Sequence, residues 1–266
     1  MFYHGIPLTL AAGSERAPAA ALAVLTPSES KRLIAKAVAA LPEIETALQS
    51  GWIIISRGTT NAFVAEELMG VSIENKIRYA AGIISQGKLG IAPRETQMKP
   101  FVLHKGQPAE LLPEKALEGF GPDDVFIKGA NAVDLGGNTG VLVAGEQGGT
   151  IGGALTTLSA RGSHLIMPIG LEKLVPSVAD VAYRMGTRRY KYSMGMNVGL
   201  IPVSTGQVVT EIQALKVLSG ATASHAASGG IGNSQGSVVL VIEGEEEAVE
   251  KAWAIIQSIK GEHPVA

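Results

Sequence analysis

The stretch Ser56-Arg57-Gly58-Thr59-Thr60-Asn61 follows the apolar run Trp52–Ile55 and leads into residues with helical apolar spacing. It predicts a buried strand, a tight turn at Gly58 and the first turn of a helix. Such a turn offers free backbone N–H groups and a positive dipole end to an anion, usually a phosphate. Gly58, Thr59, Thr60 and Asn61 are therefore the first candidate ligand-binding residues. An ordinary strand-to-helix turn with a capping threonine is the alternative that remains open.

A second stretch, Lys128-Gly129-Ala130-Asn131, follows the apolar run Val125–Ile127. The carboxyl ends of parallel strands lie at the same edge of a sheet. We therefore expect this stretch to lie next to the Gly58 turn, together with the glycine-rich helix start at Gly148-Gly149. Gly129, Asn131, Gly148 and Gly149 join the candidate binding residues. Lys128 is a candidate catalytic residue, because it could neutralise an anion or, if desolvated, form a Schiff base. A salt bridge with Asp134 or another acid is an equally good interpretation.

Composition narrows the class of protein. The chain has 266 residues, of which 46% are hydrophobic and 17% charged, with 33 glycines, and this profile is typical of an α/β fold. A formal net charge of −2 gives no electrostatic case for nucleic acid or an acidic membrane. The absence of cysteine rules out disulfides, thiolate metal sites and thiol nucleophiles. The apolar segment at residues 17 to 25 is too short to span a bilayer and lacks a basic flank, so we expect a cytoplasmic protein.

The order of predicted elements suggests two domains. Residues 1 to 25 are read as irregular and stay unassigned. Residues 26 to 190 alternate strands and helices, which favours a Rossmann-like, mostly parallel sheet covered by helices. Its first helix starts with a predicted capping box, Thr26-Pro27-Ser28-Glu29. Residues 191 to 266 are expected to form a smaller ferredoxin-like α+β domain, in which the glycine-rich stretch 228 to 236 serves as a hinge or hairpin loop.

This order of motifs resembles the superfamily of A-type ribose-5-phosphate isomerases, glucosamine-6-phosphate deaminases, sugar-phosphate-sensing repressor domains and CoA transferases. The motifs that carry it are the Gly-Thr-Thr turn, Gly-Ala-Asn-Ala-Val-Asp after the second strand, and Gly-Gly-Ala-Leu-Thr at a helix start. The resemblance covers residues 26 to 260, with short motifs that match in part. It implies a homo-oligomer that binds a phosphorylated or carboxylated small molecule.

The chain also departs from the isomerase pattern. Lys128 and Asn131 stand where the isomerase has paired acids, and Leu158 and Ser159 stand where it has its catalytic glutamate and a lysine. Thr60 replaces a glycine of the phosphate loop. Moving a proton between adjacent carbons requires a positioned base, which leucine cannot supply. The standard isomerase mechanism is therefore rejected.

Other charged residues supply further candidates. Glu146, between a predicted strand and a glycine-rich helix start, is the second candidate catalytic residue, since CoA transferases of this superfamily use a loop glutamate as nucleophile. A solvated loop acid is the alternative. Lys88 and Arg94 are cations that could hold a phosphate, or plain surface charges. The five histidines show no metal-ligand spacing, so neither a metal nor another cofactor is predicted.

The sequence thus predicts that an anionic, sugar-phosphate-like molecule binds at the strand ends, with isomerase- or transferase-type chemistry left open. The alternative function is a non-catalytic metabolite sensor or an assembly subunit that acts through a protein partner.

Overall fold

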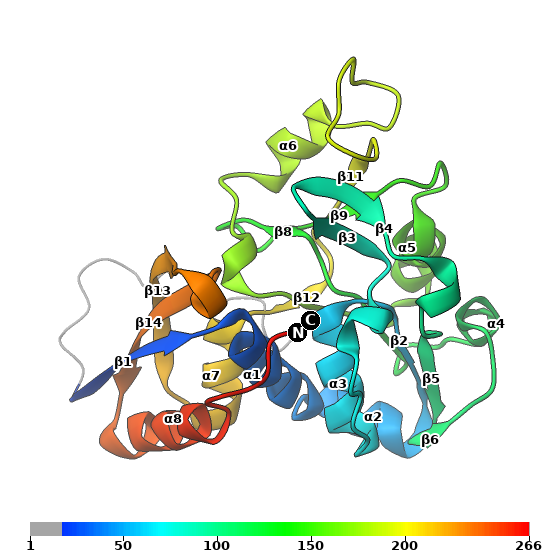
Figure 1. Cartoon of the computed structure of the whole chain (residues 1–266). Coiled ribbons are helices and arrows are strands. Elements are labelled where there is room, and N and C mark those ends of the chain that lie inside the picture. The colour runs from blue at the N-terminus through cyan, green and yellow to red at the C-terminus, as the bar shows by residue number, and fades with distance from the viewer. Residues whose placement is uncertain (1–17, 266) are drawn as a thin grey trace.

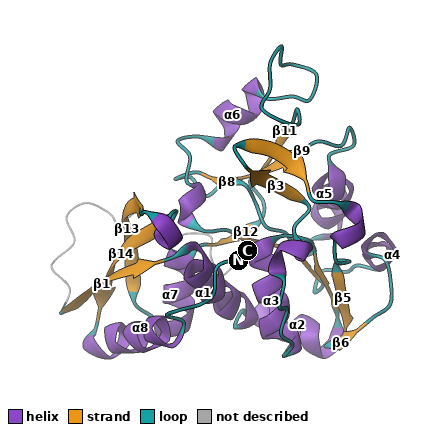
Figure 2. Ribbon diagram, in the orientation of Figure 1, coloured by secondary structure: helices purple, strands orange, loops and turns teal. Residues whose placement is uncertain are grey.

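The computed structural model describes residues 18–265, and these form an α/β fold. Within this range a six-stranded mixed sheet and eight α-helices are joined by three smaller sheets (Figures 1 and 2). The helices are α1 (Pro27–Ala39), α2 (Pro42–Ser50), α3 (Thr59–Met69), α4 (Pro113–Glu118), α5 (Gly149–Arg161), α6 (Val178–Arg184), α7 (Glu211–Ser219) and α8 (Glu246–Ser258). Short 3-10 turns are η1 (Lys76–Tyr79), η2 (Arg94–Thr96), η3 (Leu171–Lys173) and η4 (Gly232–Ser234). None of the helices in this range is long and apolar enough to cross a membrane.

The six-stranded sheet has the order β12-β10-β7-β2-β5-β6. Its four parallel strands are β2 (Trp52–Ile55), β7 (Val125–Ile127), β10 (His164–Pro168) and β12 (Gln207–Val209). The antiparallel strands β5 (Phe101–His104) and β6 (Gln107–Pro108) extend it beyond β2. Strands β2 and β7 are short, almost fully buried apolar runs, as expected of strands covered on both faces. The carboxyl ends of β2, β7, β10 and β12 therefore share one edge.

Helix α1 begins with the capping box that the sequence predicts: Thr26 accepts from the Glu29 N–H, and the Glu29 carboxylate accepts from the Thr26 N–H. The helix packs along α3, and Arg32 links the two through Glu66 at 2.6 Å and Glu67 at 2.9 Å. Burial opposes the charge of Arg32, but its carboxylate partners outweigh that and raise its pKa. This network fixes α3, whose first turn faces the strand ends.

A second layer lies on the carboxyl side of the sheet, at the top of Figure 1. It consists of α6, the antiparallel sheet β8 (Ala132–Val133), β9 (Thr139–Val143) and β11 (Gly199–Val203), and the hairpin β3 (Gly82–Ser85) and β4 (Lys88–Ile91). The Leu89 N–H donates to Met194 O at 3.0 Å, and the Met196 N–H donates to Leu89 O at 2.9 Å. The hairpin is thus tied to a loop about a hundred residues away in the chain.

The C-terminal part differs from the sequence-based prediction in two ways. The sequence places residues 199 to 203 and 207 to 209 in the small domain, but β11 pairs with β9 and β12 pairs with β10 of the central sheet. The three-stranded sheet has the order β1-β14-β13 and takes its edge strand β1 (Ala19–Leu25) from a segment read as irregular. The other strands are β13 (Thr222–Gly229) and β14 (Ser237–Gly244), and the glycine-rich stretch between them forms a hairpin loop. The rest of the unassigned extension, residues 1–17, lies outside the described residues.

The start of α5 is built on a close backbone approach. A Cβ on Gly152 would lie 2.2 Å from Gln147 O, whereas a Cβ on Gly153 would meet no atom within 4 Å. Only glycine therefore fits at position 152 without moving the turn that precedes the helix. Because Gly148 and Gly149 belong to the same turn, this contact sets where the free N–H groups of α5 point.

This contact yields a test with a matched control. Gly152→Ala should destabilise the protein by about 2 kcal/mol or more, because the added methyl group overlaps a backbone carbonyl. Gly153→Ala should instead stabilise it by about 0.5–1 kcal/mol, through higher helix propensity. Urea unfolding of both variants measures the difference. Equal stabilities would show that the Gly152 contact does not constrain the turn.

Candidate functional site

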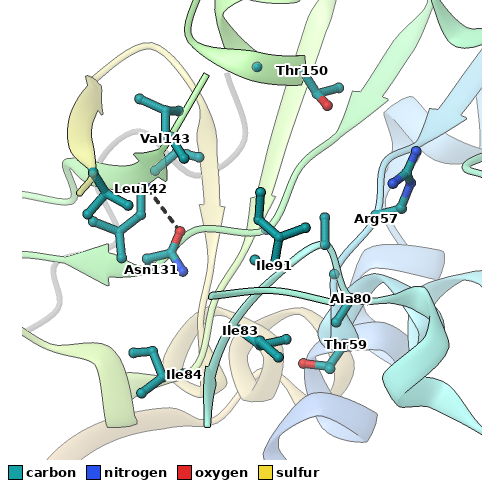
Figure 3. Close-up of a pocket in the computed structure, with 18 of the residues that line it drawn as sticks. Arg57, Thr59, Ala80, Ile83, Ile84, Ile91, Asn131, Leu142, Val143 and Thr150 are labelled. Carbon is teal, nitrogen blue, oxygen red and sulfur yellow. Dashed lines mark hydrogen bonds between the residues drawn. The ribbon is translucent and has the colours of Figure 1, made fainter. Parts of the chain in front are cut away.

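A cavity of about 720 Å³ opens where the strand ends meet the second layer (Figure 3). Its floor comes from the residues after β2 and β7, one wall from β9 and the start of α5, and another from the hairpin β3–β4. Figure 3 shows Ile83 and Ile91 of the hairpin around the same space as Arg57 and Thr59. Its volume suits a small metabolite rather than a single ion.

Nine of the twelve candidate residues line this cavity. They are Gly58, Thr59, Thr60, Arg94, Lys128, Gly129, Asn131, Gly148 and Gly149. The predicted convergence of the Gly58 turn, the Lys128 stretch and the start of α5 is therefore what the structure shows.

The other three candidates lie elsewhere. Asn61 is fully buried directly beneath the floor. Lys88 is exposed at the start of β4 and does not line the cavity. Glu146 is 73% exposed, outside the lining, and forms an ion pair with Arg188. This is the solvated position that the sequence leaves open as the alternative for Glu146.

Asn61 joins the three segments that form the floor. Its Nδ2 donates to Ser56 O at 2.7 Å and to Ile127 O at 3.3 Å, so it connects the ends of β2 and β7 to the first turn of α3. Its Oδ1 is buried without a hydrogen-bond partner among the described residues and lies 3.8 Å from where a Cβ on Gly129 would be. The φ of 153° at Gly58 is a conformation that side chains rarely allow, which explains the glycine at this turn.

Two helices of more than ten residues start at the cavity without a side-chain cap. They are α3, after Gly58, and α5, after Gly148. The first N–H groups of a helix have no partner within the helix, so here they are free for a ligand. Both helix starts also carry the positive end of the helix dipole. The lining at Thr59 and Thr150 adds a hydroxyl group at each start.

The charged side chains that line the cavity are all cationic. Within residues 18–265 they are Lys31, Arg57, Arg94, Lys128 and Lys173, and no aspartate or glutamate is among the lining. Nearby, the Glu172 carboxylate is shared: its Oε1 lies 3.8 Å from Lys173 Nζ and 4.0 Å from Lys31 Nζ. The arrangement gives the cavity a positive potential.

Lys128 is a half-buried cation that has no carboxylate partner among the described residues. Its Nζ donates to Gly129 O at 3.1 Å, and it forms no ion pair in the described part of the chain, so the expected alternative of a salt bridge with Asp134 is wrong. Burial, and then the charge of Lys173, lowers the pKa of Lys128 to about 8. Asp134 instead caps a turn, accepting from the N–H groups of Gly136 and Asn138 at 3.0 Å and of Val178 at 2.9 Å.

Sequence reasoning missed three of the cations. Arg57 belongs to the opening motif but was not selected, and its guanidinium donates to Gln97. Lys31 lies on the apolar face of α1. A lysine among the helically spaced apolar residues of this helix is the sequence signal that could have identified it. Lys173 follows the carboxyl end of β10 by a few residues, the position from which ligands are bound in parallel sheets. Burial lowers the pKa of Lys31 as well.

The closeness of Lys128 and Lys173 permits a pH-dependent test. Lys173→Met should raise the pKa of Lys128 towards its ordinary value of 10.5, because a neighbouring positive charge is removed. The pH dependence of acetylation at Lys128, followed by peptide mass spectrometry, should have its midpoint near 8 in the wild type and higher in the variant. Lys115, which is exposed and whose pKa is raised by Glu118, serves as the internal control. Identical midpoints for Lys128 and Lys115 would contradict the assignment.

The same shift has a consequence for stability. The folded pKa of about 8 lies below the unfolded value of 10.5, so between these limits the unfolded chain binds more protons. The cost of the half-buried ammonium is therefore fully present below pH 8 and disappears as the pH rises through that window. Lys128→Met should stabilise the protein relative to wild type at pH 7, with a smaller gain at pH 10. A gain that does not change with pH would point to packing instead.

Comparison with models of known protein families, with curated proteins and with solved structures finds no significant match for this chain. The resemblance to the isomerase and CoA-transferase superfamily stays a prediction.

Proposed function

We propose that the cavity binds a small molecule that carries a phosphate or carboxylate group. The observation that carries the proposal is the charge of the lining: five cationic side chains and, among the described residues, no acidic one. Lys31 is buried and Arg57, Lys128 and Lys173 are half-buried. Partial desolvation and the closeness of like charges both disfavour the charged forms. An anionic ligand would supply the missing negative charge.

The binding mode follows from the donors. The anionic group binds at the start of α3, where free N–H groups and the dipole end favour it. Arg57 lies immediately before this turn, and Arg94 lines the same cavity. A guanidinium matches the geometry of a phosphate or carboxylate with two parallel hydrogen bonds. The start of α5 offers a second set of donors for a further anionic or carbonyl oxygen.

The remaining wall suits the body of the ligand. Ile83, Ile84 and Ile91 from the hairpin, with Leu142 and Val143 from β9, give this side an apolar character (Figure 3). Asn131 lines the wall between them, and its Oδ1 accepts from the Leu142 N–H at 3.0 Å. The ligand therefore combines an anionic end with a less polar body.

The finer description of the fold belongs to the same proposal. Four parallel strands with the cavity at their carboxyl edge support a Rossmann-like relationship for the central sheet. The ferredoxin-like assignment has weaker support, since the small sheet contains three described strands and draws β1 from before the central domain. Leu158, in the position of the isomerase glutamate, is buried in the core, so isomerase chemistry of that type has no base here.

One surface favours the second candidate function, a sensor that acts through a protein partner. Tyr183, Tyr192 and Met194 are each about 80% exposed, beside the loop that holds the hairpin over the cavity. Large exposed apolar side chains close together are typical of contact surfaces. A ligand under the hairpin could change how this surface is presented, and a second copy of the chain is one partner that it could take.

The test is a thermal-shift screen with sugar phosphates, phosphorylated acids, nucleotides and CoA esters. A ligand at about 100 times its Kd adds about 2.7 kcal/mol, which raises the melting temperature by several degrees. Arg57→Gln and Arg94→Gln should each weaken binding roughly tenfold or more, since a charged hydrogen bond is lost.

Lys88→Gln is the matched control, because Lys88 is an exposed cation outside the cavity. It removes the same charge from the chain and should leave the affinity nearly unchanged. Equal losses in all three variants would mean that overall charge, rather than the cavity, attracts the ligand, and the proposal would fail.

A further inference from the structure

The main chain of Lys128 adjoins the Gly58 turn, from which α3 starts. Strands β2 and β7 run parallel with Ile55 opposite Ile127, and the Ser56 N–H continues the ladder by donating to Ile127 O at 3.0 Å. The next pair in this register is Ser56 and Lys128, at the spacing of neighbouring strands, about 5 Å. Thr59 follows three residues later and lines the same cavity. One small molecule can therefore reach both the start of α3 and the Lys128 side chain.

Contacts beneath the floor keep this juxtaposition rigid. Asn61, in the first turn of α3, donates to Ile127 O, and its Oδ1 lies close to Gly129. The Lys128 N–H donates to Ile166 O at 2.9 Å, which fixes the main chain of Lys128 to β10 on its other side. The lysine thus extends from a backbone held between two strands rather than from a surface loop.

The surroundings of Lys128 favour an amine over a fixed charge. In the described chain, its Nζ has the Gly129 carbonyl as hydrogen-bond acceptor and no carboxylate partner, and Lys173 adds a like charge. These conditions make the proton easier to lose, so a larger share of Lys128 than of an exposed lysine is the amine, whose lone pair can attack an electrophile. The arginines of the cavity stay charged, so they hold the anion and leave Lys128 available for chemistry.

We propose that Lys128 forms a Schiff base with the carbonyl carbon of a ligand whose phosphate or carboxylate is held at the start of α3. This inference rests on the proposed function and names its substrate class, anionic aldehydes and ketones. The start of α5 lines the same cavity as Lys128, and its free N–H groups are the donors assigned to the carbonyl oxygen, where negative charge develops during attack.

The step balances without a further reactant. The Lys128 ammonium gives up one proton, its nitrogen attacks the carbonyl carbon, and a C–N bond forms while the C–O double bond breaks. The oxygen takes up that proton and a second one from the nitrogen and leaves as one water molecule, and the product is a protonated imine. This cation draws electrons from the neighbouring carbon atoms of the ligand, the effect by which lysine imines promote cleavage or rearrangement.

Reductive trapping tests the inference on the full chain. The protein is incubated with dihydroxyacetone phosphate or with pyruvate in the presence of sodium cyanoborohydride, and peptides are analysed by mass spectrometry. Lys128 should gain the mass of the ligand less one oxygen atom, at a rate roughly tenfold or more above that of Lys115. Glycerol 3-phosphate, an anion without a carbonyl group, should slow the trapping by competition.

Three variants separate chemistry from binding. Lys128→Arg keeps the positive charge and should still bind glycerol 3-phosphate in the thermal-shift assay, but it should lose the trapped adduct. Lys115→Arg and Lys88→Arg should keep it. If the carbonyl ligands stabilise the protein while Lys128 stays unmodified, or is modified no faster than Lys115, the inference is overturned and the proposed function stands. If no anion of either kind stabilises the protein, both fail.

Discussion

The parallel alignment of β2, β7 and β10 is the constraint on which the cavity depends. It brings three chain segments, each leaving a buried strand, to one edge of the sheet. Asn61 then connects two of these segments with the helix that follows the first. The amide is buried, so its two donor bonds are made in a low-dielectric environment, where leaving the carbonyls unpaired would be costly. The position of every floor residue follows from this arrangement.

The second property of the site is its excess of positive charge. Lys31 and Lys173 share one carboxylate, that of Glu172, and Lys128 has no carboxylate partner among the described residues. Burial raises the pKa of the neighbouring Glu211, with the charge of Glu172 as the next cause. A protein selected for stability alone would gain from replacing such a cluster with apolar side chains. Its presence therefore fits a site that is completed by an anionic molecule, which offsets the repulsion when it binds.

The sequence predicted the parts of the fold that depend on local signals. The capping box at Thr26, the glycine turn at Gly58 and the apolar runs of β2 and β7 have short-range patterns, and all appear where they were expected. Strand β1 was missed because alanine makes up most of it and has low strand propensity, while its partner is more than two hundred residues away. The pairing of β11 with β9 was missed for a similar reason, since a strand pattern does not name its partner. The floor of the cavity was therefore predictable and its apolar wall was not. Ile83 and Ile84 belong to no recognisable sequence motif, and the hydrogen bond from Leu89 to Met194 joins segments that are far apart in the chain.

The pairing of β1 with β14 has a consequence for how the chain folds during translation. During synthesis the ribosome releases β1 long before β14, the middle strand of its sheet, exists. Strand β1 therefore stays unpaired through most of translation. Its side chains Leu22 and Val24 are exposed even in the folded chain. The central parallel sheet, by contrast, is complete once β12 has emerged. Folding of this chain is therefore expected to end with a post-translational step, in which its earliest described strand is captured by one of its last.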